Sequence, residues 1–264
     1  MSTTQSTSVL SCEKVTVAFD GFKAVQEMDL TILPGELRFL IGPNGAGKTT
    51  MLDVICGKVK PVGGKVVFNG RHGAVDVTKR KEHAIAELGI GRKFQTPSIF
   101  SGLTVEENLE ISMSQKRGVF AALRAKMSKF DRMRIETELD LIGLQAKKRQ
   151  RAGLLSHGEK QWLEIGMMLL QEPEILLLDE PVAGMTDKET EKTGELLKQI
   201  VRKRTVVVVE HDMEFVRRFA SSVTVMHEGK LLKEGSMDEV QRDDRVAEVY
   251  LGRRRDADVI GSTA

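Results

Sequence analysis

The sequence predicts an α/β fold organised around a phosphate-binding loop, and three observations predict it. Residues 42–49 fit the pattern G-x-x-x-x-G-K-[ST] between a short apolar segment and a helical one. Wholly apolar runs at residues 175–178 and 206–209 are typical of strands buried on both faces of a parallel sheet. Segments with helical periodicity flank these runs. Strands that alternate with helices in this way indicate a layered α/β domain.

Composition narrows the class of protein. The chain has 264 residues, enough for one large domain or a core with a subdomain, with 41% hydrophobic and 30% charged residues. A net charge of +2 argues against a dedicated nucleic-acid binder, so we expect no nucleic-acid partner. The two cysteines, Cys12 and Cys56, form no spaced cluster, which favours a reducing compartment without a disulfide or zinc site. No apolar run approaches the ~20 residues that span a bilayer, and we expect no signal peptide.

The N-terminal third predicts strands joined by turns. Alternating apolar residues run up to Phe19, and Asp20-Gly21 predicts a turn after them. Pro34-Gly35 predicts a second turn, and residues 37–41 form a short strand that enters the glycine loop. Residues 49–56 are predicted to be helical, with Gly57 as the stop. Residues 66–68 with Asn69-Gly70 predict a further hairpin.

Residues 98–154 predict an inserted helical subdomain. Thr104 and Glu107 fit a capping box at a helix start. The segment contains no convincing strand, and Gly143 ends its second helix. Its helical apolar positions are Val105, Leu109, Ile111, Ile135, Leu139 and Ile142.

The C-terminal part alternates between helix and strand. We expect helices at residues 160–171 and 188–202 and strands at residues 175–179 and 206–209. The predicted organisation is a nucleotide-binding core at residues 10–97 and 155–235. This core is split by the helical subdomain at residues 98–154 and followed by an extension at residues 236–264.

The glycine loop predicts a bound nucleotide. Glycines let backbone N–H groups converge on phosphate oxygens, and the N-terminus of the following helix adds partial positive charge. Lys48 can neutralise the β- and γ-phosphates, and the hydroxyl of Thr49 can hold Mg²⁺. The residues expected to bind the nucleotide here are Gly42, Pro43, Asn44, Gly45, Ala46, Gly47, Lys48, Thr49 and Thr50.

Two acids end the apolar strand at residues 175–179. A buried carboxylate at Asp179 requires a partner, and a magnesium ion is the expected one. Neighbouring residues at a strand end point in different directions, so Glu180 can face the water that attacks the γ-phosphate. We predict that Asp179 is a metal ligand and that Glu180 is the general base.

The segment Leu155-Ser156-His157-Gly158-Glu159, ahead of this acidic strand end, resembles the signature of ABC-type ATPases, usually Leu-Ser-Gly-Gly-Gln. His157 replaces a glycine of that pattern. The resemblance implies a P-loop, RecA-like ABC ATPase core with an N-terminal antiparallel β subdomain and an inserted α-helical subdomain. It implies ATP and Mg²⁺ as cofactors and ATP hydrolysis as the activity.

The order of motifs assigns further residues by this resemblance. His211 resembles the switch histidine that contacts the γ-phosphate, and Gln95 lies where the catalytic and metal-contacting Q-loop glutamine is expected. Phe19 resembles the aromatic residue that stacks on adenine, with a core aromatic as the alternative. Asp187 resembles the D-loop aspartate, although its flanking residues differ from the commoner Ser-Ala-Leu-Asp.

The signature also implies a dimer. In this family the signature caps the ATP bound by the opposite subunit, so Ser156, His157, Gly158 and Glu159 are expected to act on a partner's ATP. A role of Ser156 as the cap of its own helix is compatible with this. For the ring of His157 two readings stay open: it contacts phosphate, or it points away.

The chain is similar to importer ATPases of the branched-chain amino acid and urea branch. Residues 155–164 and 181–187 look most like the urea-type ATPase, with branched-chain amino acid import as the alternative and a non-transport ABC ATPase as a more distant one. The absence of an Asn-Lys-x-Asp motif disfavours a GTPase. The resemblance implies a second, paralogous ATPase subunit in a heterodimer, two transmembrane permease subunits and, indirectly, a periplasmic binding protein. It places the chain peripherally at the cytoplasmic face of the inner membrane.

Overall fold

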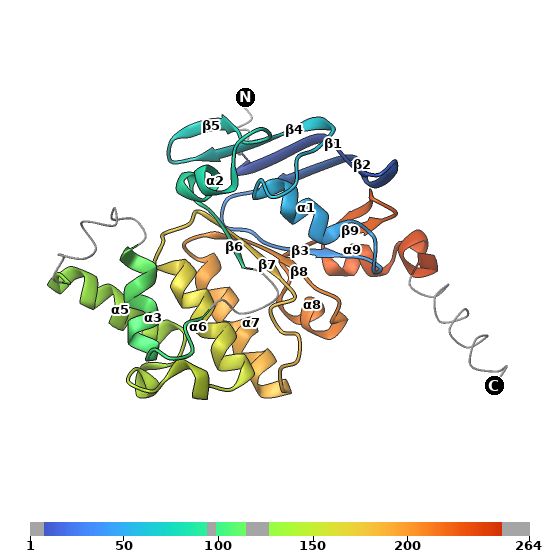
Figure 1. Cartoon of the computed structure of the whole chain (residues 1–264). Helices are drawn as coiled ribbons and strands as arrows, with labels where there is room; N and C mark the ends of the chain where they lie inside the picture. The colour runs from blue at the N-terminus through green and yellow to red at the C-terminus, as the bar shows by residue number, and fades with distance from the viewer. Residues whose placement is uncertain (1–7, 94–98, 115–126, 250–264) are drawn as a thin grey trace, which may run out of the picture.

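The computed structural model describes residues 8–93, 99–114 and 127–249. Two β-sheets and a set of helices form layers (Figure 1). An antiparallel sheet lies at the top of this view, the central sheet lies in the middle, and most of the longer helices lie below it.

The antiparallel sheet has four strands in the order β2-β1-β4-β5. Its strands are β1 (Leu10–Phe19), β2 (Phe22–Ile32), β4 (Gly63–Gly70) and β5 (Gly73–Asp76). The predicted turn at Asp20 and Gly21 is present: both residues have positive φ, 47° and 86°, and Phe19 pairs with Phe22. Two successive positive φ values match the right-handed twist of a hairpin.

The turn of the β4–β5 hairpin differs from the prediction. Asn69 and Gly70 continue strand β4, and Gly70 pairs with Gly73, so the turn falls on Arg71 and His72. The carboxylate of Glu174 explains the shift, because it accepts hydrogen bonds of 2.9 and 3.0 Å from the Arg71 amide. A residue distant in sequence therefore selects the turn.

The central sheet has six strands in the order β10-β9-β3-β8-β7-β6. All neighbouring strands run parallel except the edge pair β9–β10. The strands are β3 (Leu37–Ile41), β6 (Ile90–Lys93), β7 (Ile175–Asp179), β8 (Thr205–Val209), β9 (Ser222–His227) and β10 (Lys230–Gly235).

Successive residues of the central strands belong to different hydrophobic cores. In β7, Leu176 and Leu178 pack into one core, while Ile175 and Leu177 pack into the other. Strand geometry causes this, since neighbouring side chains point to opposite faces. The continuous apolar runs seen in the sequence are therefore strands covered on both sides.

Helices cover the sheet and form the insert. They are α1 (Lys48–Ile55), α2 (Glu82–Leu88), α3 (Val105–Ser114), α5 (Lys129–Leu141), α6 (His157–Leu169), α7 (Asp187–Val201), α8 (Met213–Phe219) and α9 (Met237–Gln241), with short 3₁₀ turns at Gln145–Lys147 and Ala152–Leu154. Helix α6 begins at His157, one turn earlier than predicted, because the Ser156 side chain caps it.

The described part of the predicted helical insert contains α3, α5 and both 3₁₀ turns. The predicted capping box is confirmed: Thr104 Oγ1 accepts from the Glu107 amide at 3.2 Å, and the Glu107 carboxylate accepts from the Thr104 amide at 2.7 Å. Leu109 of α3 and Ile135 of α5 join the same core as α6. Among the described residues of the insert, β-pairing is confined to one isolated bridge, Thr104 to Arg151.

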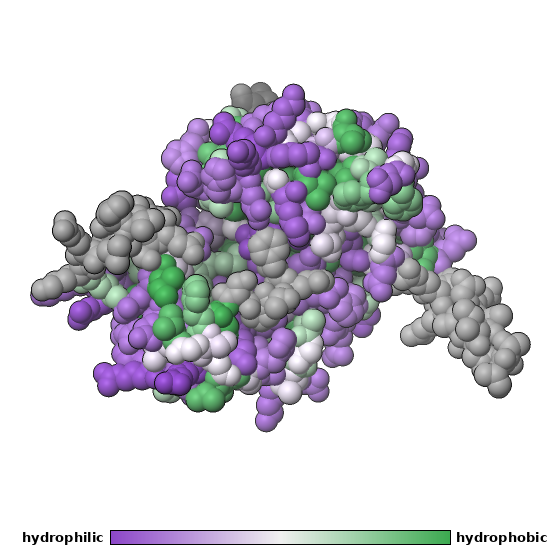
Figure 2. All heavy atoms as spheres, in the orientation of Figure 1, coloured by the Kyte–Doolittle hydropathy of each residue, from purple (hydrophilic) through white to green (hydrophobic). Residues whose placement is uncertain are grey.

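The surface shown in Figure 2 is mainly hydrophilic, with small separate groups of hydrophobic residues. No helix among the described residues has the length and apolar character to cross a membrane. Both cysteines are buried and unpaired, and burial, with the nearby Asp29 carboxylate, raises the pKa of the Cys12 thiol to about 12.

Candidate nucleotide and signature sites

Three neighbouring strands of the central sheet end at the same level. Val209 of β8 is the register partner of both Leu40 in β3 and Asp179 in β7. The glycine loop follows β3, Glu180 follows β7 and His211 follows β8, so all three segments lie at the carboxyl ends of the strands. In open α/β sheets, the edge beyond the carboxyl ends of the strands is where ligands bind.

The glycine loop has a backbone that only glycine adopts without strain. Gly42 and Gly47 have φ values of 147° and 95°. A Cβ atom at Gly47 would lie 2.5 Å from the carbonyl oxygen of Ala24 in β2, and one at Gly42 would overlap that of Met226. The loop is thus wedged between the two sheets, with helix α1 starting at Lys48. Its backbone amides precede a helix N-terminus, which is the arrangement that binds phosphate.

Within this loop, the Lys48 ammonium donates to the carbonyl oxygens of Gly42 and Pro43 at 2.8 and 2.9 Å. These bonds fold the lysine back along the loop. Ala46 is buried, whereas Asn44, Gly45 and Thr49 are exposed and Thr50 is half-buried. The exposed residues leave the loop open to a ligand.

Thr49 and Asp179 meet, as predicted. The Thr49 hydroxyl lies 3.5 Å from Asp179 Oδ1, across 130 residues of sequence. A guanidinium completes the group: Arg92 Nη2 lies 3.4 Å from Asp179 Oδ2 and 2.9 Å from Asp53 Oδ1. Burial raises the pKa of the Asp179 carboxyl, and the charge of Arg92 and the Thr49 hydrogen bond oppose the rise. A hydroxyl and a carboxylate at this spacing fit Mg²⁺, which takes few protein oxygens and retains water or phosphate.

Glu180 and His211 face each other beside this group. His211 Nδ1 lies 3.5 Å from Glu180 Oε1, and both side chains are partly exposed. Glu180 has a φ of 47°, a left-handed conformation that costs a non-glycine residue about 1–2 kcal/mol. The left-handed turn takes the chain out of strand β7 at this residue, so Asp179 and Glu180 face different surroundings.

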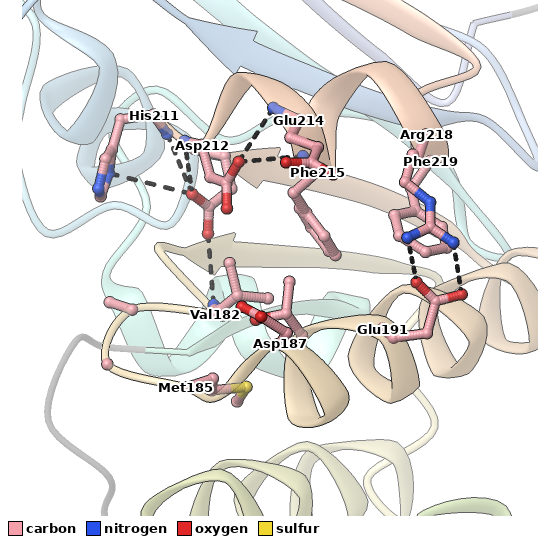
Figure 3. Close-up of a pocket in the computed structure, with 14 residues that line it drawn as sticks. Val182, Met185, Asp187, Glu191, His211, Asp212, Glu214, Phe215, Arg218 and Phe219 are labelled. Carbon is pink, nitrogen blue, oxygen red and sulfur yellow. Dashed lines mark hydrogen bonds and ion pairs between the residues drawn. The ribbon is translucent and has the colours of Figure 1, made fainter.

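Glu210 is a buried carboxylate that holds two loops together. Its Oε1 accepts from the Val182 amide at 3.3 Å, and its Oε2 accepts from the amides of His211 and Asp212 at 3.0 and 3.4 Å. Figure 3 shows Val182 facing His211 and Asp212, and all three residues line a cavity of about 440 Å³ together with Glu210. Burial raises the pKa of the Glu210 carboxyl, against the effect of these amides.

The signature segment forms the first turn of α6. The Ser156 hydroxyl accepts from the Glu159 amide at 3.2 Å and donates to the Glu189 carboxylate at 2.8 Å. A Cβ atom on Gly158 would lie 2.6 Å from the same carboxylate, so the Glu189 side chain packs against this glycine. Glu189 belongs to α7, where it also completes a capping box with Thr186. Its pKa is held low by the Thr186 amide and by Ser156.

The ring of His157 faces the chain that follows Glu180. Its Nε2 lies 3.1 Å from the carbonyl oxygen of Ala183. Because a carbonyl can only accept, Nε2 carries the proton. The side-chain amide nitrogen of Gln161, one turn further along α6, lies 3.4 Å from Nε2, but two nitrogens that both carry hydrogen form no hydrogen bond with each other. The exposed ring is therefore bonded to Ala183 of its own subunit.

The remaining predicted site residues are Phe19, Asp187 and Gln95. Phe19 ends β1 with 49% of its surface exposed, available for stacking. Asp187 begins α7 and lines the cavity of Figure 3 together with His211. Gln95 lies outside the described residues; strand β6, which leads to it, ends at Lys93 beside Leu178 of β7.

Sequence reasoning missed four acidic or basic residues of these sites: Asp53, Arg92, Glu189 and Glu210. Glu210 carried a signal, since it is an acid directly after a wholly apolar strand, where burial is expected. Asp53 and Arg92 carried none, because their roles depend on strand and helix neighbours distant in sequence.

Comparison with known proteins agrees with this geometry. The ABC transporter family pattern matches residues 25–183. The chain therefore belongs to the ABC transporter family, and it is an ATPase of that family. The high-affinity branched-chain amino acid transport ATP-binding protein LivG of Escherichia coli K12 is 34% identical over 255 residues, covering 92% of this chain and 98% of LivG. Within the family, the chain lies in this LivG-like branch of ATP-binding subunits.

Solved structures confirm the predicted fold class. The ADP conformation of the ATP-binding cassette MJ1267 has a TM-score of 0.81 at 26% identity, covering 93% of this chain and 99% of that one. The dimeric post-hydrolysis state of the cassette MJ0796, bound to ADP and Pi, has a TM-score of 0.72 at 27% identity, covering 86% and 98%. The α/β fold with an antiparallel β subdomain and a mixed sheet is thus that of an ABC cassette.

Proposed function

We propose that this chain is the ATP-hydrolysing subunit of an ABC importer and that it works with Mg²⁺. The observation that carries the proposal is the meeting of Thr49 with Asp179, 3.5 Å apart, at the edge where the glycine loop, Glu180 and His211 leave the sheet. Mg²⁺, when bound, balances negative charge on the phosphates. The oxygens of Thr49 and Asp179 would hold it there, with Gln95 as a further expected ligand.

The chain's own residues account for the hydrolytic step. Lys48 and the loop amides bind and orient the phosphates, as helix N-termini and charged groups do in phosphoryl transfer. Glu180 accepts a proton from the attacking water, and His211 contacts the γ-phosphate beside it. Phe19 and Asp187 complete the nucleotide site from the hairpin and from α7.

We propose that the signature acts on the ATP of a partner ATPase. The amides at the start of α6, together with the hydroxyl of Ser156, present donors to an anion outside the subunit. The dimeric state of the related cassette MJ0796 supports this assembly. Ser156, Gly158, Glu159 and the backbone amide of His157 then belong to a composite site, and ATP joins the two subunits.

The imported solute is the finer part of the proposal. The name of LivG supports branched-chain amino acids better than urea. Urea stays a second candidate because residues 155–164 and 181–187 look most like the urea-type ATPase. Two permease subunits, a paralogous ATPase partner, a periplasmic binding protein and a position at the cytoplasmic face of the membrane belong to the same proposal. So do the boundaries of core, helical subdomain and extension.

The variant Glu180→Gln tests the proposed chemistry. In the assembled transporter it should lower ATP turnover at this chain's own site by roughly 10²- to 10⁴-fold, the usual contribution of a general base, with ATP affinity unchanged. Glu195→Gln on the exposed side of α7 is the matched control and should leave turnover intact. Normal turnover in Glu180→Gln would remove Glu180 from the mechanism.

Uptake measurements separate the candidate solutes. Cells that lack this chain should lose uptake of labelled leucine and keep uptake of labelled urea, and the wild-type chain should restore the loss. The opposite pattern would favour the urea-type importer. Loss of neither would contradict both candidates.

A further inference from the structure

The ring of His157 connects the signature to the segment that carries Glu180. Ala183, whose carbonyl oxygen receives the His157 hydrogen bond, donates its own amide to the carbonyl oxygen of Glu180 at 3.2 Å. Two hydrogen bonds therefore lead from the first turn of α6 to the residue that we assign as general base. Both lie within one subunit.

The segment from Glu180 to Thr186, here called the 180–186 loop, is shaped to receive this contact. Gly184 has a φ of 72°, and a Cβ atom there would lie 3.8 Å from the His157 ring, so the ring rests against this turn. The Met185 amide donates to the Val182 carbonyl at 3.1 Å, which closes a second turn. On its other side the loop is fixed by Glu210, through the Val182 amide.

We propose that His157 is a positioning residue that couples the two nucleotide sites of the dimer, an inference that rests on the proposed function. The backbone at the start of α6 responds to the partner's ATP. The imidazole transmits the position of that turn to the 180–186 loop, and so to Glu180, which acts on the ATP bound by this chain. Loading of one site thus adjusts the general base of the other.

The arrangement of the ring favours this role over direct phosphate contact. The proton on Nε2 is already directed to the carbonyl oxygen of Ala183. A glycine at position 157, as in the usual signature, would keep the backbone amide and lose the link to Ala183. The two roles predict effects at different ATP molecules, and this difference makes them separable.

A double-mutant comparison in the assembled transporter tests the coupling, with a wild-type partner ATPase. The four chains are wild type, His157→Leu, Glu180→Gln and the double variant. His157→Leu removes the donor and should lower the turnover of this chain's own site about fivefold, as loss of one hydrogen bond implies; that turnover is the total minus the turnover that remains in Glu180→Gln. In the Glu180→Gln background, the remaining turnover belongs to the partner's site, and His157→Leu should leave it unchanged.

Rescue and local exchange provide readouts beyond turnover. His157→Gln keeps an N–H donor near the position of Nε2 and should restore most of the activity. Hydrogen exchange at the Ala183 amide should speed up in His157→Leu, return toward the wild-type rate in His157→Gln, and occur without a change in the midpoint of thermal unfolding.

Three results would overturn the coupling: wild-type turnover in His157→Leu, a further fall of the remaining turnover in the double variant, or failure of a folded His157→Gln to recover. The second of these would instead assign the ring to the partner's phosphate. Undiminished hydrolysis in Glu180→Gln alone would refute the proposed function rather than the role of His157.

Discussion

The hydroxyl of Ser156 donates to the carboxylate of Glu189 at 2.8 Å, although the two residues belong to different helices. The hydroxyl proton of the signature serine is therefore already engaged within its own subunit. The same carboxylate lies against Gly158, so a negative charge stands at the helix N-terminus where a phosphate of the partner's ATP is expected. Binding of that phosphate requires Ser156 to exchange one anion for another.

Removal of this charge should favour closure of the dimer. Glu189→Gln keeps a side chain suited to the capping box with Thr186 but is neutral. Weaker repulsion of the incoming phosphate should tighten ATP-dependent association of the two ATPase subunits roughly threefold to tenfold at low salt. Sedimentation at graded ATP concentrations measures this association of the two subunits. Glu195→Gln on the same helix is the control, and equal association in all three proteins would contradict the expectation.

The fit of Gly47 between the sheets predicts a position-specific loss. Gly47→Ala places a methyl group against the Ala24 carbonyl and forces alanine to a φ of 95°. Gly45→Ala meets only the second problem, because nothing lies within 4 Å of its Cβ position and its φ is 79°. Both variants should lose about 1–2 kcal/mol of unfolding free energy from backbone strain. Gly47→Ala should lose more and also weaken ATP binding. Urea unfolding and nucleotide titration compare the pair, and equal losses would refute the steric argument.

Arg92 should stabilise the buried Asp179 and the half-buried Asp53 at once. Arg92→Met leaves Asp53 and Asp179 without this cation, and removal of one partner from a buried pair typically costs 3–5 kcal/mol. Loss of the cation that lies 3.4 Å from Asp179 Oδ2 also removes repulsion toward Mg²⁺, so ATPase activity should need less Mg²⁺. Asp53→Asn in the same background should recover part of the stability. Unfolding by urea and Mg²⁺ titration of activity test both effects; an unchanged Mg²⁺ requirement would separate Arg92 from the metal site.

Glu210 predicts a pH dependence of stability. Burial raises the pKa of its carboxyl, so the folded chain binds this proton more readily than the unfolded chain does. Such a group favours folding fully below its unfolded pKa of about 4.3, and this contribution is lost as pH rises through the raised pKa. Relative to Glu210→Gln, the wild type should therefore lose unfolding free energy from about pH 4 upward. Urea unfolding from about pH 4 upward measures this loss, with the exposed Glu214→Gln as control. A difference in unfolding free energy between wild type and Glu210→Gln that does not change with pH would contradict a raised pKa of Glu210.

Most of the fold was predictable because its signals are local. The apolar run at residues 175–178, the turn at Asp20 and the capping box at Thr104 each depend on neighbours in sequence. One failure has a tertiary cause, because the carboxylate of Glu174 binds the Arg71 amide in the β4–β5 turn. The other is local: Ser156 caps α6, so the helix begins at His157, although the predicted helix began only at residue 160.

The candidate site was predictable where motifs carry it. The glycine loop, Asp179, Glu180 and His211 follow from spacing and family resemblance, and the structure brings them to one sheet edge. The supporting residues were not predictable, because Arg92 reaches Asp179 from another strand and Glu189 reaches Ser156 from another helix. Their side chains have no periodic signal, and only the folded chain juxtaposes them.

The shared carboxylate of Glu210 has a consequence for timing. Three backbone amides, one from the 180–186 loop and two from the segment at His211, donate to the carboxylate of Glu210. If one of these two segments moves and takes the Glu210 carboxylate with it, the hydrogen bonds between that carboxylate and the other segment are strained. We therefore expect Glu180, the proposed general base, and His211, the proposed γ-phosphate contact, to move together. Loss of the phosphate from the side of His211 should then also displace the loop that His157 contacts.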